Sequence, residues 1–249
     1  MSITINQQQL ANYRANIEQQ AQNAVNVVRQ RLQGRTGTAS ELSSVANNAI
    51  REVLPYFSDN AQLISCMVFD EICAKAGNNV SVQFYDDLID WNSISSRVKQ
   101  LAMQYADDDI EEFYNQLYYM IADQVRGCSR KTMSRNCSEN NMAYQIIASP
   151  DACMFCLAMA SRGAMHWDED GYADDGFFHD HCNCTPMPAD DVNYSGNEAD
   201  DYYDEYIKQR DELLEKREEG RERGDGRFAD HSKLFGDKTF SHQYAREHR

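Results

Sequence analysis

The sequence feature that most constrains the fold is a cluster of cysteine and histidine residues in the second half of the chain. A CxxC pair is followed by an HxxCxC group, and together they comprise Cys153, Cys156, His179, Cys182 and Cys184. Thiolate and imidazole are the ligands that zinc prefers, and two such arms usually close one tetrahedral site. We therefore expect one structural Zn²⁺ per chain. Its predicted ligands are the four cysteines, with His179 as the substitute for Cys182 or Cys184.

The spacing within each arm suits a metal site. One tight turn can direct both sulfur atoms of a CxxC pair to the same ion, and the short helix expected over residues 157–162 helps to ionise the thiols. A CxC pair on an extended strand points both side chains to one face. Because the acidic loop of about fourteen residues between the arms buries little core, a metal ion there would contribute on the order of 10 kcal/mol of apparent folding free energy.

Three other interpretations of the cysteines stay open, namely one or two disulfides, unliganded core cysteines, and a redox or catalytic thiol. A zinc deaminase is excluded, because its signature needs an HxE motif upstream of the cysteines and all six histidines follow Cys156. Outside the cluster, Cys66 and Cys73 are expected to be buried core thiols. The spacing of Cys128 and Cys137 makes them only weak candidate ligands.

Helical periodicity dominates the rest of the chain. The expected helices cover residues 5–33, 38–54, 58–76, 95–106, 108–126 and 198–219. The first has an apolar stripe that faces either the core or a partner: Leu10, Tyr13, Ile17, Ala21, Ala24, Val28 and Leu32. Thr38 and Glu41 form a capping-box pattern that starts the second, and Gly77 ends the third. A break is predicted before Pro55. The helix that follows it is apolar on nearly all sides, so we expect it to be the buried centre of this half. Strand-like segments lie within residues 80–91 and at 143–148, and residues 128–141 are interpreted as a basic polar connector.

Composition supports a mainly α protein. Apolar residues make up 42% of the 249 residues, enough for a core, and only four prolines and twelve glycines interrupt the chain, which favours long helices. The predicted parts are a helical domain (1–141), a small α+β module clipped by zinc (142–190), and a charged helix with a flexible tail (191–249). Neither an apolar run of membrane-spanning length nor a signal-peptide pattern is found. We therefore expect no membrane contact and a reducing compartment.

The net charge of −16 is unevenly distributed. Residues 1–55 carry five basic and three acidic groups, which gives +2. Residues 56–219 carry twelve basic and thirty-two acidic groups, which gives −20, and residues 220–249 carry seven basic and five acidic groups, which gives +2. Affinity for nucleic acid comes mainly from lysine and arginine that neutralise phosphates. The acidic middle therefore disfavours DNA contact, and only the two ends of the chain remain candidates.

Two segments of the Cys/His cluster carry a family resemblance. Residues 152–164 read ACMFCLAMASRGA, and residues 178–188 read FHDHCNCTPMP. This pair resembles the C-terminal module of minor head proteins of tailed phages, in the branch related to the phage Mu F-like head-morphogenesis proteins. That branch pairs an A-C-x-F-C-x-x-x-A-S-R-G segment with an aromatic-His-x-x-Cys-x-Cys-Thr segment. The match is clear over residues 143–188.

The resemblance implies a non-enzymatic minor capsid protein, associated with the portal inside the virion and present in the host cytoplasm during assembly. It implies roles in head assembly and in DNA packaging or ejection, with the portal and other head proteins as partners. Packaged DNA is a candidate partner for the basic tail. Two alternatives stay open. One is a capsid maturation protease or transferase-type enzyme, for which Cys153 or Cys182 would have to act with His166; the other is a zinc-stabilised adaptor protein without a virion.

Overall fold

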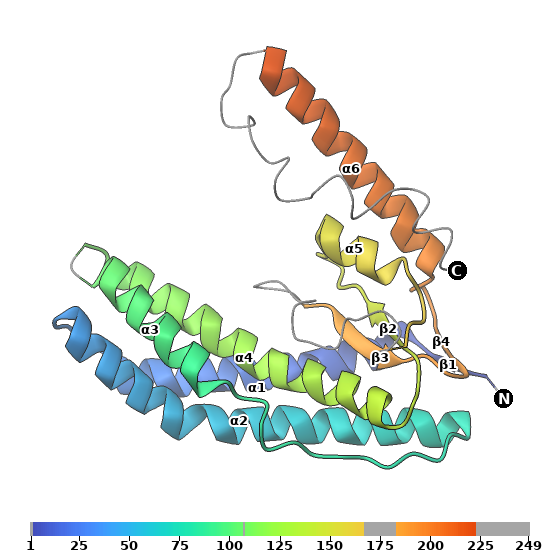
Figure 1. The fold of residues 1–249 in the computed structure, drawn as a ribbon, viewed down its shortest axis with the longest axis horizontal. Helices are drawn as coiled ribbons and strands as arrows, with labels where there is room; N and C mark the ends of the chain where they lie inside the picture. Colours follow the sequence, from blue (N-terminus) through green and yellow to red (C-terminus); the bar gives the residue numbers. More distant parts are fainter. Residues whose placement is uncertain (1, 107, 167–182, 223–249) are drawn as a thin grey trace.

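The fold is that of a mainly α protein, as the periodicity predicts (Figure 1). A computed structural model describes residues 2–106, 108–166 and 183–222, the last six of them by backbone alone. In chain order, its elements are β1 (Ile3–Ile5), α1 (Gln7–Leu32), α2 (Ala39–Ala76), α3 (Trp91–Tyr105), α4 (Ile110–Glu139), β2 (Tyr144–Ile147), α5 (Met154–Ala160), β3 (Thr185–Pro188), β4 (Val192–Tyr194) and α6 (Ala199–Glu222).

The helices α1, α2 and α4 pack lengthwise into a bundle, and α3 lies against α2 and α4 (Figure 1). The apolar stripe predicted for α1 is buried at every position: Leu10, Tyr13, Ile17, Ala21, Ala24, Val28 and Leu32. Steps of three and four residues place these side chains on one face, and that face meets the other two helices. Asn6 and Gln9 form a capping box that starts α1. The core of this half is therefore built as the sequence indicates.

The predicted break at Pro55 is wrong, because α2 is one helix of 38 residues with Pro55 inside it. It begins at the expected capping box of Thr38 and Glu41 and ends at Gly77, whose φ of +84° suits glycine. A proline inside a helix costs about 3 kcal/mol, since its ring displaces the backbone hydrogen bond of one turn. The buried residues on both sides of Pro55 pack on α1 and α4 along the whole helix, and this burial outweighs the local penalty.

The interpretation of residues 128–141 as a polar connector is also wrong. Helix α4 continues past Gly127 to Glu139, and its last turns are buried. Their polar side chains are satisfied locally: the Thr132 hydroxyl donates to the Cys128 carbonyl at 2.8 Å, and the Asn136 amide donates to the Thr132 carbonyl at 2.9 Å. A buried polar residue costs little when it is hydrogen-bonded in this way. Composition alone does not distinguish such a helix from a solvated loop.

The strand expected within residues 80–91 is absent from the described elements, but the connector there is held as if it were one. Asn136 donates to the Gln83 carbonyl and accepts the Gln83 N–H, at 2.9 and 2.7 Å. Asn140 bonds Ser81 in the same two ways, at 2.9 and 2.7 Å. Two side-chain amides thus replace the backbone of a neighbouring strand and fix the connector along α4.

Two small sheets pair the start of the chain and residues 144–147 with the segment 185–194, and β3 of that segment contacts α2 and α4 of the bundle. Strand β2, expected from the sequence, pairs antiparallel with β3, and β1 pairs in parallel with β4. The core is continuous from the bundle into these sheets, and Tyr144, Ile147 and Met187 are among its most buried side chains. Arg14 of α1 donates to the carbonyls of Ile147 and Ala148 at 2.9 and 3.0 Å. The boundaries predicted after residues 141 and 190 stay predictions.

The charged helix α6 extends away from the bundle and meets α5 near its first turns (Figure 1). Tyr202 and Tyr206 pack against the core, whereas residues 211–216 are exposed. Among the helices that the structure describes, none has the length and apolar character needed to cross a membrane.

Candidate functional site

Three of the five predicted zinc ligands lie within the described part of the chain. Cys153 is the residue that precedes α5 and is exposed, and Cys156 is buried in the first turn of α5. Cys184 is buried directly before β3. His179 and Cys182 lie outside the described residues. Among the residues that are described, no group of three or more Cys, His, Asp or Glu is arranged to hold a metal ion.

Cys184 is buried, which disfavours its thiolate, and the backbone N–H of Ser149 provides a hydrogen bond that acts in the opposite direction. The backbone N–H of Ser149 donates to Cys184 Sγ at 3.4 Å, and the Ser149 hydroxyl lies 3.8 Å from the same atom. Hydrogen bonds of this kind favour the thiolate and orient it in metal sites. The Asn183 amide also lies 3.5 Å from an Asp151 oxygen. The structure therefore brings the end of the HxxCxC arm beside the segment that leads into the CxxC pair.

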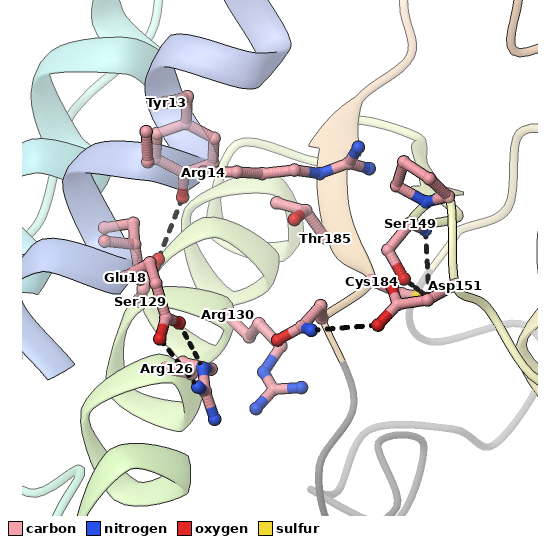
Figure 2. Close-up of a pocket in the computed structure, with 14 residues that line it drawn as sticks. Tyr13, Arg14, Glu18, Arg126, Ser129, Arg130, Ser149, Asp151, Cys184 and Thr185 are labelled. Atoms are coloured by element: carbon pink, nitrogen blue, oxygen red, sulfur yellow. Dashed lines mark hydrogen bonds and ion pairs between the residues drawn. The ribbon is translucent and has the colours of Figure 1, made fainter. Parts of the chain in front are cut away.

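A cavity of about 260 Å³ adjoins Cys184 and lies between the bundle and the module (Figure 2). Its walls come from α1, α4 and the segments 149–151 and 183–185. The lining residues are Tyr13, Arg14, Ala15, Ile17, Glu18, Arg126, Ser129, Arg130, Ser149, Pro150, Asp151, Asn183, Cys184 and Thr185. Three arginines line it, Arg14 from α1 and Arg126 and Arg130 from α4 (Figure 2). In a chain with a net charge of −16, this is a local concentration of positive charge.

Much of that positive charge is used within the protein. Arg126 donates to both oxygens of Glu18, at 2.8 and 3.1 Å, and to Asp123 at 2.8 Å. Partial burial acts to raise the pKa of Glu18, but the hydrogen bonds from Arg126 and Gln22 outweigh it and hold this pKa below its ordinary value. Since Arg14 bonds two carbonyls at the end of β2, these arginines chiefly fasten α1 to α4 and to the module.

A triad of hydroxyl groups lies at the inner end of the cavity. The Tyr13 hydroxyl is 3.0 Å from Ser65 Oγ and 2.9 Å from Ser129 Oγ, and the two serines are 2.8 Å apart. Burial raises the pKa of Tyr13, despite the hydrogen bonds from the two serines. The phenol therefore stays neutral and acts as a structural link among α1, α2 and α4. Sequence reasoning placed Tyr13 in the core but could not find its serine partners, which lie 52 and 116 residues away.

The cysteines outside the cluster are core residues, as expected for Cys66 and Cys73. Burial raises the pKa of Cys73 to about 12, with added repulsion from Asp70 and Asp190, and burial raises the pKa of Cys137 well above its ordinary value. Metal ligation needs the thiolate. These two thiols therefore stay protonated. His166, the candidate partner in an enzyme, is exposed and follows Met165, which bridges to Tyr144.

Comparison with known proteins gives one family. A family model described as "VG15 protein" matches residues 4–209, which include the whole bundle, both sheets and the Cys/His cluster. No curated protein and no solved structure matches the chain significantly.

Proposed function

The chain belongs to the VG15 protein family, a match that indicates a viral protein, and we propose that it is a structural minor head protein of a tailed phage. The observation that carries the proposal is the extent of the family match. It spans 206 residues, from 4 to 209, so one family model covers both the helical bundle and the Cys/His module. The phage resemblance of residues 143–188 lies inside the matched range. Under this proposal the protein binds near the portal and takes part in head assembly and in DNA packaging or ejection.

A structural role agrees with how the polar groups of the cavity are used. Its arginines and hydroxyls fasten helices to one another, as Arg126 does with Glu18 and Tyr13 does with Ser129. We propose that the protein acts through contacts with the portal and other head proteins, without catalysing a reaction. The acidic middle of the chain favours protein partners over DNA, since a phosphate backbone is repelled by it.

We further propose that the Cys/His cluster holds one structural Zn²⁺. Cys153, Cys156 and Cys184 would supply three ligands, and Cys182 or His179 would complete the set. The N–H of Ser149 directed at Cys184 Sγ supports this assignment, because it favours a thiolate at a buried position. Helix α5 has seven residues and strands β2 and β3 have four each, so a metal would fasten a module that is built of short elements.

Purified phage particles test the proposed function. Mass spectrometry of particles should detect the protein in substoichiometric amount to the major capsid protein, and the portal protein should co-purify with a tagged chain from infected cells. A phage carrying a stop codon in the gene should produce heads that lack the protein and are defective in assembly, packaging or ejection. Particles of full infectivity that contain no copy of the chain would refute the proposal.

A further inference from the structure

Three large apolar side chains of α2 face solvent. Tyr56, Leu63 and Met67 are 65%, 54% and 64% exposed. They are seven and four residues apart, so they line up along one side of the helix. The opposite side of the same helix is buried in the bundle, and Phe69 there is fully enclosed. A helix at the surface of a folded protein usually presents polar residues outward. Helix α2 therefore has a second apolar side that nothing in the described chain covers.

The connector that runs alongside α2 widens this surface (Figure 1). The N–H of Tyr85 donates to the Gln62 side chain at 3.2 Å, and Cys66 Sγ donates to the Gln83 carbonyl at 3.2 Å. These bonds hold the connector next to the exposed side of α2. Phe84, between the two bonded residues, is 47% exposed. We call the set of Tyr56, Leu63, Met67 and Phe84 the α2 stripe.

Carboxylates border the α2 stripe. Asp59 and Asp70 are exposed on α2 itself, within one turn of Leu63 and Met67, and Asp86 is exposed on the connector. Burial and the nearby Asp86 raise the pKa of Asp59. Within the described chain, no lysine or arginine is ion-paired with any of these three. The edge of the stripe is therefore negative.

We propose that the α2 stripe is the docking surface for an amphipathic helix of another protein, one whose apolar face is bordered by lysine or arginine. The seven- and four-residue spacing suits a helix that lies along α2 and packs side chains between those of the stripe. The carboxylate border selects for basic flanks, since opposite charges across an interface favour one partner over others. A second copy of this chain would bring Asp59 and Asp70 against the same acidic border, which like-charge repulsion disfavours. This surface goes beyond the proposed function and does not depend on it.

The test uses the full chain and three labelled synthetic peptides. One is an amphipathic helix with leucine at every third and fourth position and lysine beside the leucines, the second has glutamate in place of lysine, and the third is a scrambled sequence of the first. We expect fluorescence anisotropy to show binding of the lysine peptide alone. Substitution of Leu63→Gln with Met67→Gln should weaken that binding at least about tenfold, as for central residues of an interface. Met103→Gln, at a 71% exposed methionine of α3, is the matched control and should leave it unchanged.

Three results would overturn the inference. Equal binding of the scrambled peptide, or undiminished binding to the double variant with an unchanged circular dichroism spectrum, would show that only the net charge attracts the peptide. Sedimentation that reveals a dimer of the full chain, lost in the double variant, would show that a second copy covers the stripe. Hydrogen exchange of the complex should instead show protection along α2 at the stripe and in the connector near Phe84, with none on α3.

Discussion

Replacement of Tyr13 by phenylalanine should lower the free energy of unfolding by about 0.5–1.5 kcal/mol, because it removes one hydroxyl proton and with it one net buried hydrogen bond. The Tyr13 hydroxyl lies 3.0 and 2.9 Å from the hydroxyls of Ser65 and Ser129. The serines keep their mutual bond of 2.8 Å, and Ser65 also donates to the Ala61 carbonyl at 2.9 Å, so neither hydroxyl is left unsatisfied.

Urea denaturation followed by circular dichroism measures this loss as a lower midpoint with an unchanged slope. In thermal unfolding, each kcal/mol corresponds to a shift of about 2–4 °C for a chain of this size. Tyr56→Phe, at a largely exposed tyrosine, is the matched control and should stay within about 0.5 kcal/mol of the wild type.

The hydroxyl triad also predicts that the stability losses of two substitutions within it are not additive. Ser129→Ala removes the same Tyr13 bond from its other end, so the double variant Tyr13→Phe with Ser129→Ala should lose less than the sum of the two single losses. Additive losses, or a Tyr13→Phe protein as stable as the wild type, would refute the argument that the three helices are linked by a cooperative polar contact in their core.

Three further predictions concern the metal, the proline and a buried thiol. Metal analysis of the protein purified under reducing conditions should find about one zinc per chain. The Cys153→Ser variant should lose this zinc, and the matched control variant Cys66→Ser should keep it. A wild-type protein that contains no metal and has titratable thiols would contradict the zinc site. Pro55→Ala should raise the free energy of unfolding by up to about 3 kcal/mol, since it restores the N–H that can bond the Arg51 carbonyl, and an unchanged urea midpoint would contradict this. Burial raises the pKa of the Cys73 thiol to about 12 in the folded protein, whereas its pKa in the unfolded chain is near 9. The protonated thiol therefore contributes its full stability below about pH 9. This contribution is lost at about 1.4 kcal/mol per pH unit as the pH rises from about 9 toward 12. The alkaline loss of stability should therefore be shallower in Cys73→Ala, and an identical slope would count against it.

The sequence predicted the elements whose boundaries depend on local chemistry. The α1 stripe repeats at helical spacing over its whole length, and the capping box at Thr38 and the glycine stop at Gly77 are both observed. In each case the signal and its partner lie within one turn of each other, so no knowledge of the tertiary fold is needed. The same holds for β2, where the apolar run is short and is bounded by the CxxC segment.

The sequence failed where distant packing overrides a local preference. Pro55 and Gly127 both look like helix ends, yet α2 and α4 pass through them because the buried faces continue on the far side. Local penalties of about 1–3 kcal/mol are smaller than the burial of several core side chains. Asn136 lies in the segment that its polar composition predicts to be a solvated connector. In the structure its side-chain amide is buried and forms hydrogen bonds with the backbone of Gln83 in the connector.

In the candidate site too, the features that depend on neighbouring residues could be predicted, and those that depend on distant segments could not. The ligand types and the spacing of the cysteine arms are local features. The structure places Cys156 and Cys184 in the core and Cys153 at the surface, and zinc binding by these residues stays a prediction. The cavity beside Cys184 was not foreseen. Its wall joins Arg14 of α1, Arg126 of α4 and Thr185 of β3, and residues from three distant segments leave no common signature in the sequence.

The second half of α2 is apolar on nearly all sides, as its sequence shows, but it is not buried on all sides. A helix that is apolar on nearly all sides is expected to be enclosed on all sides, and the structure encloses only one side and leaves the α2 stripe exposed. Leu63 and Met67 are 54% and 64% exposed, so each forgoes only part of the hydrophobic stabilisation of full burial, on the order of 1–2 kcal/mol for each side chain. A binding partner that covers the stripe would recover that free energy. The discrepancy between pattern and structure is therefore the observation from which we propose the α2 stripe as a docking surface, and that proposal does not depend on the Cys/His module.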